Sequence, residues 1–460
     1  MEYKRRVLRY HFSGIAGAGM NPLARLLRAH GHIVQGSDRS FDQGKNADLA
    51  FALRALDIDL TPQDGSAVTR SLDRFVYSTA VEADTPEMRA ARDLGIERVA
   101  RPALLAEVVG EGRPGIAIAG TSGKSTVTGM LAWLARESGV AATVIGGAAL
   151  VGDGEGGCFV AGPHGAAVAA EACESDGTLR GYRPALGLVH NITRDHGEVD
   201  TLRDQFRTFA RQCGRLLVNA RCPEALALGR DFDALTYGAT PAATARLDVG
   251  AVAPWRATGT LHAGGRSIAL DVPQPGLHNL ENAAAAALLA LELGIAPAVI
   301  EALIARFPGV ARRFQVVGTS PGGVRVVDDF AHNGDKIRAA LTTAQAGARR
   351  VVAVFQPHGF GPARFLRPEL KTLLPSLLRA GDRFCYAEIY YAGGTTTRDL
   401  SSRDLADDLP PALECGYAED HAEVVRWVAA NARSGDTVLM LGARDPELPR
   451  LARAVLAALP

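Results

Sequence analysis

Residues 115–139 read GIAIAGTSGKSTVTGMLAWLARESG, which is an apolar strand, a glycine-rich loop and a segment of helical periodicity in direct succession. Two more stretches begin with the same strand–loop–helix order, one at residue 6 and one near residue 324. Strands and helices that alternate around glycine loops are typical of α/β proteins with parallel sheets. The sequence therefore predicts an α/β protein.

The length and the three strand–loop–helix starts predict three domains. A chain of 460 residues is long enough for two to four domains at roughly 100–200 residues each. Stretches rich in polar residues, Pro and Gly at 111–114 and 307–309 have the composition of linkers. We therefore expect a Rossmann-like domain at 1–110, a central P-loop ATPase domain at 111–311 and a second Rossmann-like domain at 312–460.

The charge balance excludes several classes of protein. Lys plus Arg total 50 and Asp plus Glu total 50, so the formal net charge is zero. Without surplus positive charge, we expect no nucleic acid as a partner. No apolar run reaches the roughly 20 residues of a membrane span, and the charged N-terminus is unlike a signal peptide. We expect no membrane insertion and a cytoplasmic location.

Cysteine and lysine usage is also informative. The six cysteines lack the C-x-x-C spacing of zinc sites, so we expect reduced thiols. There are only five lysines, and between Lys45 and Lys336 the sole one is Lys124, inside the glycine-rich loop. Where arginine supplies nearly every other cation, this exception suggests that a compact ammonium is required there.

The glycine-rich loop predicts an ATP site. It consists of Gly120, Thr121, Ser122, Gly123, Lys124, Ser125 and Thr126. A loop between a strand and a helix turns backbone N–H groups toward a phosphate, and the helix N-terminus adds positive potential. Lys124 would then contact the β- and γ-phosphates, and the hydroxyl of Ser125 or Thr126 would reach Mg²⁺. The alternative is a packing turn with an exposed lysine. Ile118 stands where the usual P-loop has its first glycine, so the loop is a shortened variant.

The first loop predicts a nucleotide site. Gly14, Gly17 and Gly19 follow a strand, and Asp38 stands about 20 residues further on. The order of the glycines is not G-x-G-x-x-G, so a dinucleotide fits no better than another phosphate-bearing nucleotide. A packing turn without a ligand remains open as an alternative.

Polar side chains follow two strands of the central segment. Glu171, Glu174 and Asp176 follow one strand, and Thr193 to His196 follow the next. In a parallel sheet these strand ends meet at one edge, where ligands bind. We expect Glu174 and His196 to bind a metal ion or to orient its water.

Seven motifs occur in the order seen in the Mur ligase family, which the chain therefore resembles from about residue 8 to 445. They are GTSGKST (120–126), EACESDGT (171–178), HNITRDH (190–196), GLHNLENAAAA (276–286), ARRFQ (311–315), DDFAHN (328–333) and FQPH (355–358). HFSGIAGAGMNPLARLL (11–27) and YSTAVEADTPEM (77–88) look like a uridine-nucleotide domain of that family.

The resemblance implies an ATP-dependent amide ligase with Mg²⁺ as cofactor. Its partners would be a UDP-N-acetylmuramate-type nucleotide sugar and an amino acid or short peptide, and we expect a monomer or weak dimer. The catalytic residues it implies are Lys124, His196, Arg313 and His332. ATP would be bound by the residues of the 120–126 loop with Asn279, Asn282, Arg313 and Asp329, and the metal by Ser125, Glu174 and His196. The substrate residues it implies are Gly14, Ala16, Gly17, Ala18, Gly19, Met20, Asp38, Ser78, Thr79, Ala80, His332, His358 and Arg364.

Several positions depart from the family pattern and leave the amine open. Ser122 replaces a usual His, Asn333-Gly334 replaces His-Pro, and residues 442–445 read GARD in place of a Gly-Ala-Gly-Asp-like loop. No lysine lies between Lys124 and Lys336, which excludes the carbamylated lysine that some family members use. L-Alanine is the favoured amine, and a tripeptide or another amine is the alternative. Two other classes remain: a UDP-sugar sensor without catalysis, and a nicotinamide oxidoreductase, which would not explain the 120–126 loop.

Overall fold

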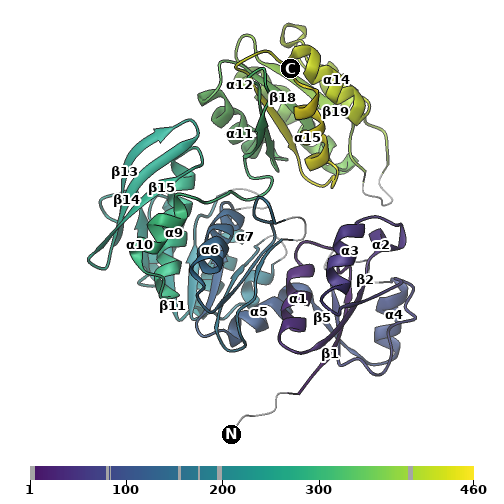
Figure 1. The fold of residues 1–460 in the computed structure, drawn as a ribbon, viewed down its shortest axis with the longest axis vertical. Coiled ribbons are helices and arrows are strands. Elements are labelled where there is room, and N and C mark those ends of the chain that lie inside the picture. Colours follow the sequence, from purple (N-terminus) through teal and green to yellow (C-terminus); the bar gives the residue numbers. More distant parts are fainter. Residues whose placement is uncertain are drawn as a thin grey trace. The chain divides into compact units, whose positions relative to one another are not determined.

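The chain forms three sheets flanked by helices (Figure 1). The structure, a computed structural model, describes residues 6–78, 82, 84–153, 157–174, 177–193, 199–391 and 397–460. Two compact units are present. The first comprises Met1–Val252 with Ala257–Val310, and the second comprises Ala253–Arg256 with Ala311–Pro460.

The first sheet has five parallel strands in the order β3-β2-β1-β4-β5. Its strands are β1 (Arg9–Ser13), β2 (Ile33–Ser37), β3 (Asp59–Thr61), β4 (Arg74–Tyr77) and β5 (Glu97–Ala100). Its helices are α1 (Asn21–Ala29), α2 (Arg39–Asp42), α3 (Ala47–Arg54), α4 (Pro86–Asp93) and α5 (Arg101–Glu111). This strand order is that of a Rossmann half-fold, with the first βα turn carrying the 14–20 loop.

The second sheet has ten strands in the order β15-β14-β13-β12-β11-β10-β6-β9-β7-β8. Its strands are β6 (Gly115–Ala119), β7 (Ala142–Gly146), β8 (Cys158–Val160), β9 (Ala167–Glu171), β10 (Leu186–Val189), β11 (Arg215–Asn219), β12 (Leu235–Gly238), β13 (Ala245–Ala253), β14 (Arg256–Ala263) and β15 (Arg266–Val272). Its helices are α6 (Lys124–Ser138), η1 (Thr178–Gly181), α7 (Val199–Gln212), α8 (Pro223–Asp231), α9 (Leu277–Glu292) and α10 (Pro297–Ile304). The strand β6 lies between β10 and β9, so the loop after β6 is flanked by the ends of both neighbours.

The third sheet has six strands in the order β16-β17-β21-β18-β19-β20, and only β16 is antiparallel to its neighbour. Its strands are β16 (Gln315–Thr319), β17 (Arg325–Asp329), β18 (Val351–Gln356), β19 (Arg383–Ala387), β20 (Gly416–Ala418) and β21 (Thr437–Gly442). Its helices are α11 (Gly334–Ala346), α12 (Phe360–Leu377), α13 (Ser402–Asp407), η2 (Pro411–Leu413), α14 (His421–Asn431) and α15 (Leu448–Ala458).

One apolar core joins the first two sheets. Side chains of β1, α1, α5, β6, β9 and α7 belong to a single buried cluster, which includes Phe12, Leu105, Ala119 and Phe206. The helix α5 packs against β4 and β5 of the first sheet and against β6 and β9 of the second. Burial of apolar area on this scale is the main favourable term in folding, so the two sheets stabilise each other.

The predicted α/β class is confirmed, and each of the three predicted strand–loop–helix starts forms at its expected place. The boundaries near 110 and 311 stay a prediction. All six cysteines are free thiols, as expected. Among the described residues, none of the helices has the length and apolar character needed to cross a membrane.

Candidate functional site

The 120–126 loop is shaped by two glycines. Gly120 and Gly123 have φ values of 142° and 82°, and the αL conformation of Gly123 starts α6 directly after it. A Cβ on Gly123 would lie 2.7 Å from Oδ1 of Asn282 and 2.7 Å from Cδ2 of His190. Both the φ angle and the lack of space therefore require glycine. The first N–H groups of α6 have no partner within the helix and point into the loop.

Lys124 lies at the centre of this site and is almost completely buried. Its Nζ donates to the carbonyl oxygen of Gly120 at 2.5 Å and to Oε2 of Glu174 at 2.8 Å. Burial by itself would lower the pKa of Lys124, but the charge of Glu174 outweighs this and raises the pKa. A permanently charged ammonium is thus held at the loop.

Glu171 lies beside the hydroxyl of Ser125. The Oγ of Ser125 donates to Oε1 of Glu171 at 3.0 Å, and Oε2 of Glu171 accepts from the N–H of Gly147 at 3.2 Å. That Ser125 and Glu174 share a metal ion stays a prediction, and in the structure Glu174 accepts from Lys124. Glu171 ends β9, and this strand position was the available signal.

The oxygen atoms around Ser125 fit Mg²⁺, which prefers hard oxygen ligands and keeps several waters. Hydroxyl and carboxylate oxygens of Ser125, Glu171 and Glu174 lie around the start of α6. Within the described ranges, no group of three or more His, Cys, Asp and Glu side chains has the geometry of a complete metal site. The predicted ligand His196 lies outside the described residues.

Asn191 attaches the loop to the end of β10. Its Oδ1 accepts from the Oγ of Thr121 at 2.9 Å and from the N–H of Ser122 at 2.8 Å, while its Nδ2 donates to the carbonyl of Ser122 at 3.1 Å. The hydroxyls of Thr121 and Thr193 are 2.7 Å apart. Asn191 was not among the predicted site residues, although it stands in the quoted HNIT motif.

Asn279 and Asn282 reach the loop from the first turn of α9. Nδ2 of Asn279 donates to the carbonyl of Pro275 at 2.8 Å, and Nδ2 of Asn282 donates to Oδ1 of Asn279 at 3.1 Å. Oδ1 of Asn282 is buried without a hydrogen-bond partner in the described structure. An unpaired buried acceptor costs about 1–3 kcal/mol, which a ligand with a donor group would recover. The predicted ATP role of Asn282 stays a prediction.

His190 supports the floor of the loop as a neutral ring. Its Nδ1 is hydrogen-bonded to the hydroxyl of Tyr237, and both side chains are buried. Burial, assisted by His278 and Lys124, lowers the pKa of His190 to about 4. An uncharged imidazole beside Lys124 avoids a second buried positive charge.

The carboxylate of Asp38 holds the 14–20 loop in place through hydrogen bonds with backbone N–H groups. Oδ2 of Asp38 accepts from the N–H of Ala16 at 3.0 Å, and Oδ1 accepts from the N–H of Ser40 at 2.9 Å as the N-cap of α2. Gly14 has a φ of 85°, and its N–H donates to the carbonyl of Ser37 at 2.8 Å. Asp38 therefore orders the loop and the next helix.

Beneath this loop, a buried carboxylate joins the ends of two strands, β1 and β2. Glu87 of α4 is fully buried and lies 2.9 Å from Nε2 of His11. It also accepts from the hydroxyls of Ser13 at 2.5 Å and Ser37 at 2.6 Å, the last residues of β1 and β2. Glu87 lies in the 77–88 stretch but is not among the site residues predicted above.

Two further side chains lie at the 14–20 loop and were not among the site residues predicted from the sequence. The guanidinium of Arg101 lies 3.5 Å from the place of a Cβ on Gly19, and it has no ion-pair partner among the described residues. The amide of Asn21, the first residue of α1, is fully buried without a hydrogen-bond partner there. Ala18 and Met20 lie in the loop as predicted, and Ser78 follows β4. The predicted Thr79 and Ala80 lie outside the described residues.

In the second unit, the carboxylate of Asp329 forms hydrogen bonds with backbone N–H groups. Its carboxylate lies near Arg312 and Arg313 and accepts from the N–H of Phe314 at 2.7 Å and of Ala331 at 2.8 Å. Arg312 donates to the carbonyls of Gly442 at 2.6 Å and Ala443 at 2.8 Å, and Arg313 lies over the ring of Phe330. The turn that carries Arg313 is therefore fixed by its neighbours.

The predicted amine-side residues lie at the carboxyl ends of β17 and β18. The rings of His332 and His358 are 5.6 Å apart, and Nδ1 of His332 pairs with the carbonyl of Phe330 at 2.9 Å. Burial, with help from the charge of Arg444, lowers the pKa of His358. Arg364 instead forms an ion pair with Asp399.

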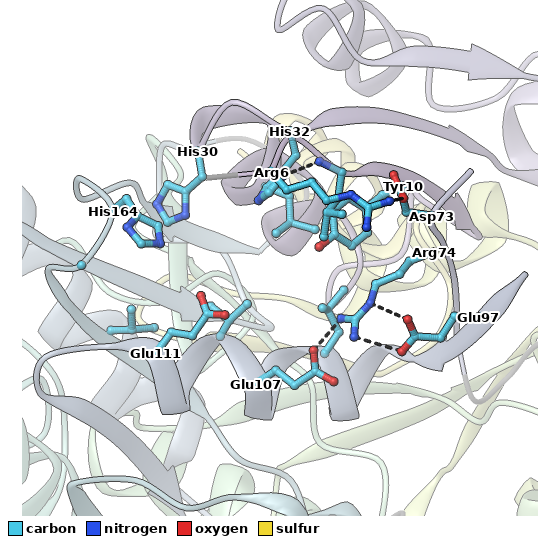
Figure 2. A pocket seen from close by; sticks show the side chains of 16 residues that line it. Arg6, Tyr10, His30, His32, Asp73, Arg74, Glu97, Glu107, Glu111 and His164 are labelled. Atoms are coloured by element: carbon cyan, nitrogen blue, oxygen red, sulfur yellow. Dashed lines mark hydrogen bonds and ion pairs between the residues drawn. The ribbon is translucent and has the colours of Figure 1, made fainter. Parts of the chain in front are cut away.

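A cavity of about 560 Å³ lies at the opposite strand ends of the first sheet (Figure 2). Its arginines are already paired, Arg6 with Asp73 at 2.6 Å and Arg74 with Glu97 at 2.9 Å and Glu107 at 2.6 Å. Figure 2 shows Arg74, Glu97 and Glu107, which come from β4, β5 and α5, facing one another at the cavity. They connect α5 to the first sheet.

Three family models match the chain in succession. The Mur ligase family catalytic domain matches residues 9–113, the Mur ligase middle domain matches 118–290, and the Mur ligase glutamate ligase domain matches 312–444.

Similar proteins cover almost the whole chain. A UDP-N-acetylmuramate–L-alanine ligase of Kineococcus radiotolerans is 36% identical over 462 residues, which cover 96% of this chain and 94% of the relative. A UDP-N-acetylmuramate–L-alanine ligase of an Arthrobacter species is 36% identical, covering 93% of this chain and 90% of the relative. Among solved structures, a UDP-N-acetylmuramate–alanine ligase of Thermotoga maritima has a TM-score of 0.77 at 24% identity and covers 98% of both chains. A murein peptide ligase of Psychrobacter arcticus has a TM-score of 0.69 at 21% identity, again covering 98% of both. The two structural likenesses support the fold.

Proposed function

Because the chain belongs to the Mur ligase family, we propose that it is an ATP-dependent ligase that joins the carboxylate of UDP-N-acetylmuramate to an amino acid, with L-alanine favoured. This reaction belongs to the synthesis of peptidoglycan precursors. The use of ATP and a nucleotide sugar supports the predicted cytoplasmic location. ATP is the phosphoryl donor in this family, and Mg²⁺ is proposed as its counterion.

The observation that carries the proposal is the buried contact of Lys124 with Glu174 beside the Ser125–Glu171 pair. A charged lysine and a set of oxygen ligands at one helix N-terminus are the groups that phosphoryl transfer needs. A packing turn would not place a buried ammonium and two carboxylates together, because their desolvation is costly.

The proposed reaction has two steps. A carboxylate oxygen of the sugar attacks the γ-phosphorus, the bond to the β-phosphate oxygen breaks, and ADP leaves with an acyl phosphate formed. The amine then attacks the acyl carbon, loses a proton, and expels inorganic phosphate. Lys124 and the N–H groups of the 120–126 loop stabilise negative charge on the transferred phosphoryl group. Magnesium, when bound by Ser125 and the neighbouring carboxylates, supplies further positive charge.

The test is the substrate dependence of phosphate release. We expect phosphate only when ATP, UDP-N-acetylmuramate and an amino acid are all present, with L-alanine most active among single amino acids. Activity with a tripeptide in place of L-alanine would favour the recycling alternative. Nucleotide-sugar binding without any phosphate release would favour the sensor.

Glu171 is proposed as a metal ligand together with Ser125. Glu171→Gln keeps the size of the side chain but removes its charge, so half-maximal activity is expected to require about tenfold more Mg²⁺. Titration of phosphate release with Mg²⁺ at saturating substrates measures this. Glu174→Gln is the matched comparison. If only Glu174→Gln shifts the Mg²⁺ requirement, Glu171 is not a ligand.

Arg101 is proposed to contact the diphosphate of the nucleotide sugar. Its guanidinium lies beside Gly19 at the start of α5 and lacks a partner in the described structure. A charge-assisted hydrogen bond contributes about 1.5–3 kcal/mol, so Arg101→Ala should raise KM for the sugar about 10- to 100-fold with kcat little changed. Arg98→Ala, which removes an exposed arginine on the preceding strand β5, is the control. Equal KM values in the two variants would contradict the assignment.

A further inference from the structure

The 14–20 loop uses most of its backbone N–H groups to hold its own shape. Those that already donate to a carbonyl or carboxylate oxygen belong to Gly14, Ile15, Ala16, Gly17 and Met20. In the described part of the chain, the N–H groups of Ala18 and Gly19 donate to no oxygen. They directly precede α1, whose N-terminus adds positive potential. The loop therefore keeps two donors for an anionic ligand, and their direction depends on what fixes the rest of the loop.

Ser37 fixes the start of the loop. Its carbonyl accepts from the N–H groups of Gly14 at 2.8 Å and Ile15 at 3.0 Å. It is also the partner of Ser13 in the pairing of β1 with β2, and Ser13 is the residue directly before Gly14. Partners in parallel strands carry their side chains on the same face, and both hydroxyls donate to the carboxylate of Glu87. Glu87 thus holds the two strand ends from which the loop begins.

The hydrogen bonds around Glu87 indicate an ionised carboxylate. The Nε2 of Gln35 donates to the carbonyl of Ala67 at 2.9 Å and lies 3.0 Å from Nδ1 of His11. Because an amide NH₂ group only donates, Nδ1 of His11 carries no proton, and its Nε2 donates to Glu87 at 2.9 Å. Three donors, one from His11 and two from serine hydroxyls, therefore face the two oxygens of Glu87.

We propose that Glu87 is a positioning residue for the nucleotide sugar. Through Ser13 and Ser37 it keeps the loop in the shape that binds the diphosphate before the ligand arrives. Glu87 is fully buried, so it acts through the loop and not by touching the ligand. A loop that is already ordered loses less conformational entropy on binding, and the difference is gained as affinity. The inference rests on the proposed ligase function and deepens it, since it names what sets the affinity for the sugar.

The first variant is Glu87→Gln, which keeps the size of the side chain. Glutamine has one oxygen and one NH₂ group, so it cannot accept from all three donors. If the binding-competent loop falls to about a tenth of the population, KM for UDP-N-acetylmuramate rises about tenfold. Since the hydrogen bonds of Glu87 are to residues of β1 and β2, kcat and KM for ATP should stay near their wild-type values.

The second variant is Ser37→Ala, which removes one of the three donors and leaves the carbonyl that holds the loop. It should raise the same KM. In the double variant with Glu87→Gln, the rise should be smaller than the product of the two separate rises, because both changes act on the same hydrogen bonds. A rise equal to that product would show that the carboxylate does not act through Ser37.

The matched control is Leu53→Ala, which separates positioning from a general loss of stability. Leu53 is fully buried on α3, and truncation of a core leucine is destabilising. Circular dichroism shows whether each variant is folded, and chemical denaturation compares their stabilities. KM for the nucleotide sugar should stay at the wild-type value in folded Leu53→Ala.

Each outcome decides on positioning and on the ligase function separately. A wild-type KM in Glu87→Gln, or an equal rise in Leu53→Ala, overturns the positioning role while the ligase function stands. If the wild-type protein binds UDP-N-acetylmuramate in a calorimetric titration but releases no phosphate, the ligase function fails. The dissociation constants of the same variants then decide on positioning. If the wild-type protein does not bind the sugar, both fail, and if Glu87→Gln does not fold, Ser37→Ala decides alone.

Discussion

Lys124→Ala is expected to reduce phosphate release by at least about 10³-fold while UDP-N-acetylmuramate still binds. The lysine is the only cation that the described structure places inside the phosphate loop, held by Gly120 and Glu174. Without the ammonium group of Lys124, the negative charge of the transferred phosphoryl group would be repelled by the carboxylate of Glu174. Initial rates of phosphate release and calorimetric titration with the nucleotide sugar measure the two effects.

The matched control is Lys371→Ala. This lysine is half-exposed on α12, 3.6 Å from Asp408, and should leave turnover near that of the wild type. A Lys124→Ala protein that still turns over within tenfold of the wild type would show that the loop is not the phosphoryl-transfer site. If the protein is a sensor, neither lysine variant differs from the wild type in turnover, because there is none.

Glu87→Ala is expected to lower the free energy of unfolding of the first unit by about 3–5 kcal/mol. The carboxylate is fully buried and holds His11, Ser13 and Ser37, and its loss leaves these three polar groups buried without their acceptor. Chemical denaturation followed by circular dichroism measures the change. Glu137→Ala removes an exposed glutamate on α6 and should change the free energy by less than about 1 kcal/mol. Similar losses in the two variants would contradict a structural role for Glu87.

The same group predicts a pH dependence. Burial would raise the pKa of Glu87, but hydrogen bonds from His11, Ser13 and Ser37 outweigh it and lower the pKa below the ordinary value of 4.5. A carboxyl with a lower pKa in the folded state than in the unfolded state stabilises the fold above its unfolded pKa. This contribution is lost as the pH falls below about 4.5 toward the lower folded value. Glu87→Gln should show a shallower loss of stability in that range.

The sequence could predict the loops because glycine spacing, strand composition and helical periodicity are local properties. Gly120 and Gly123 lie in the loop after β6 and Lys124 begins α6, as the spacing of these residues predicted. Glu171 could not be separated from Glu174 in this way, because which carboxylate meets Ser125 depends on the register between β6 and β9. The hydrogen bond between Ser125 and Glu171 could therefore not be predicted before the strand pairing was known, and the metal ligands stay a prediction.

Contacts between distant segments explain the other residues that were missed. Glu87 meets Ser13 and Ser37 across 74 and 50 residues of sequence, and Arg101 meets the loop at Gly19 across 82 residues. No short motif marks such a partner. For Asp38, the position at the end of β2 could be read from the sequence, but not that its carboxylate caps α2 and accepts from the N–H of Ala16; its predicted contact with the substrate stays a prediction.

The core shared by the first two sheets has a consequence for substrate binding. Phe12 and Ala119, each close to one of the two glycine loops, belong to the same buried cluster, and close packing resists relative displacement of such groups. The spacing between the 14–20 loop and the 120–126 loop is then set when the chain folds. The proposed sites for the nucleotide sugar and ATP therefore lose less orientational freedom relative to each other when both ligands bind. This alignment raises the effective concentration of the sugar carboxylate at the γ-phosphate of ATP.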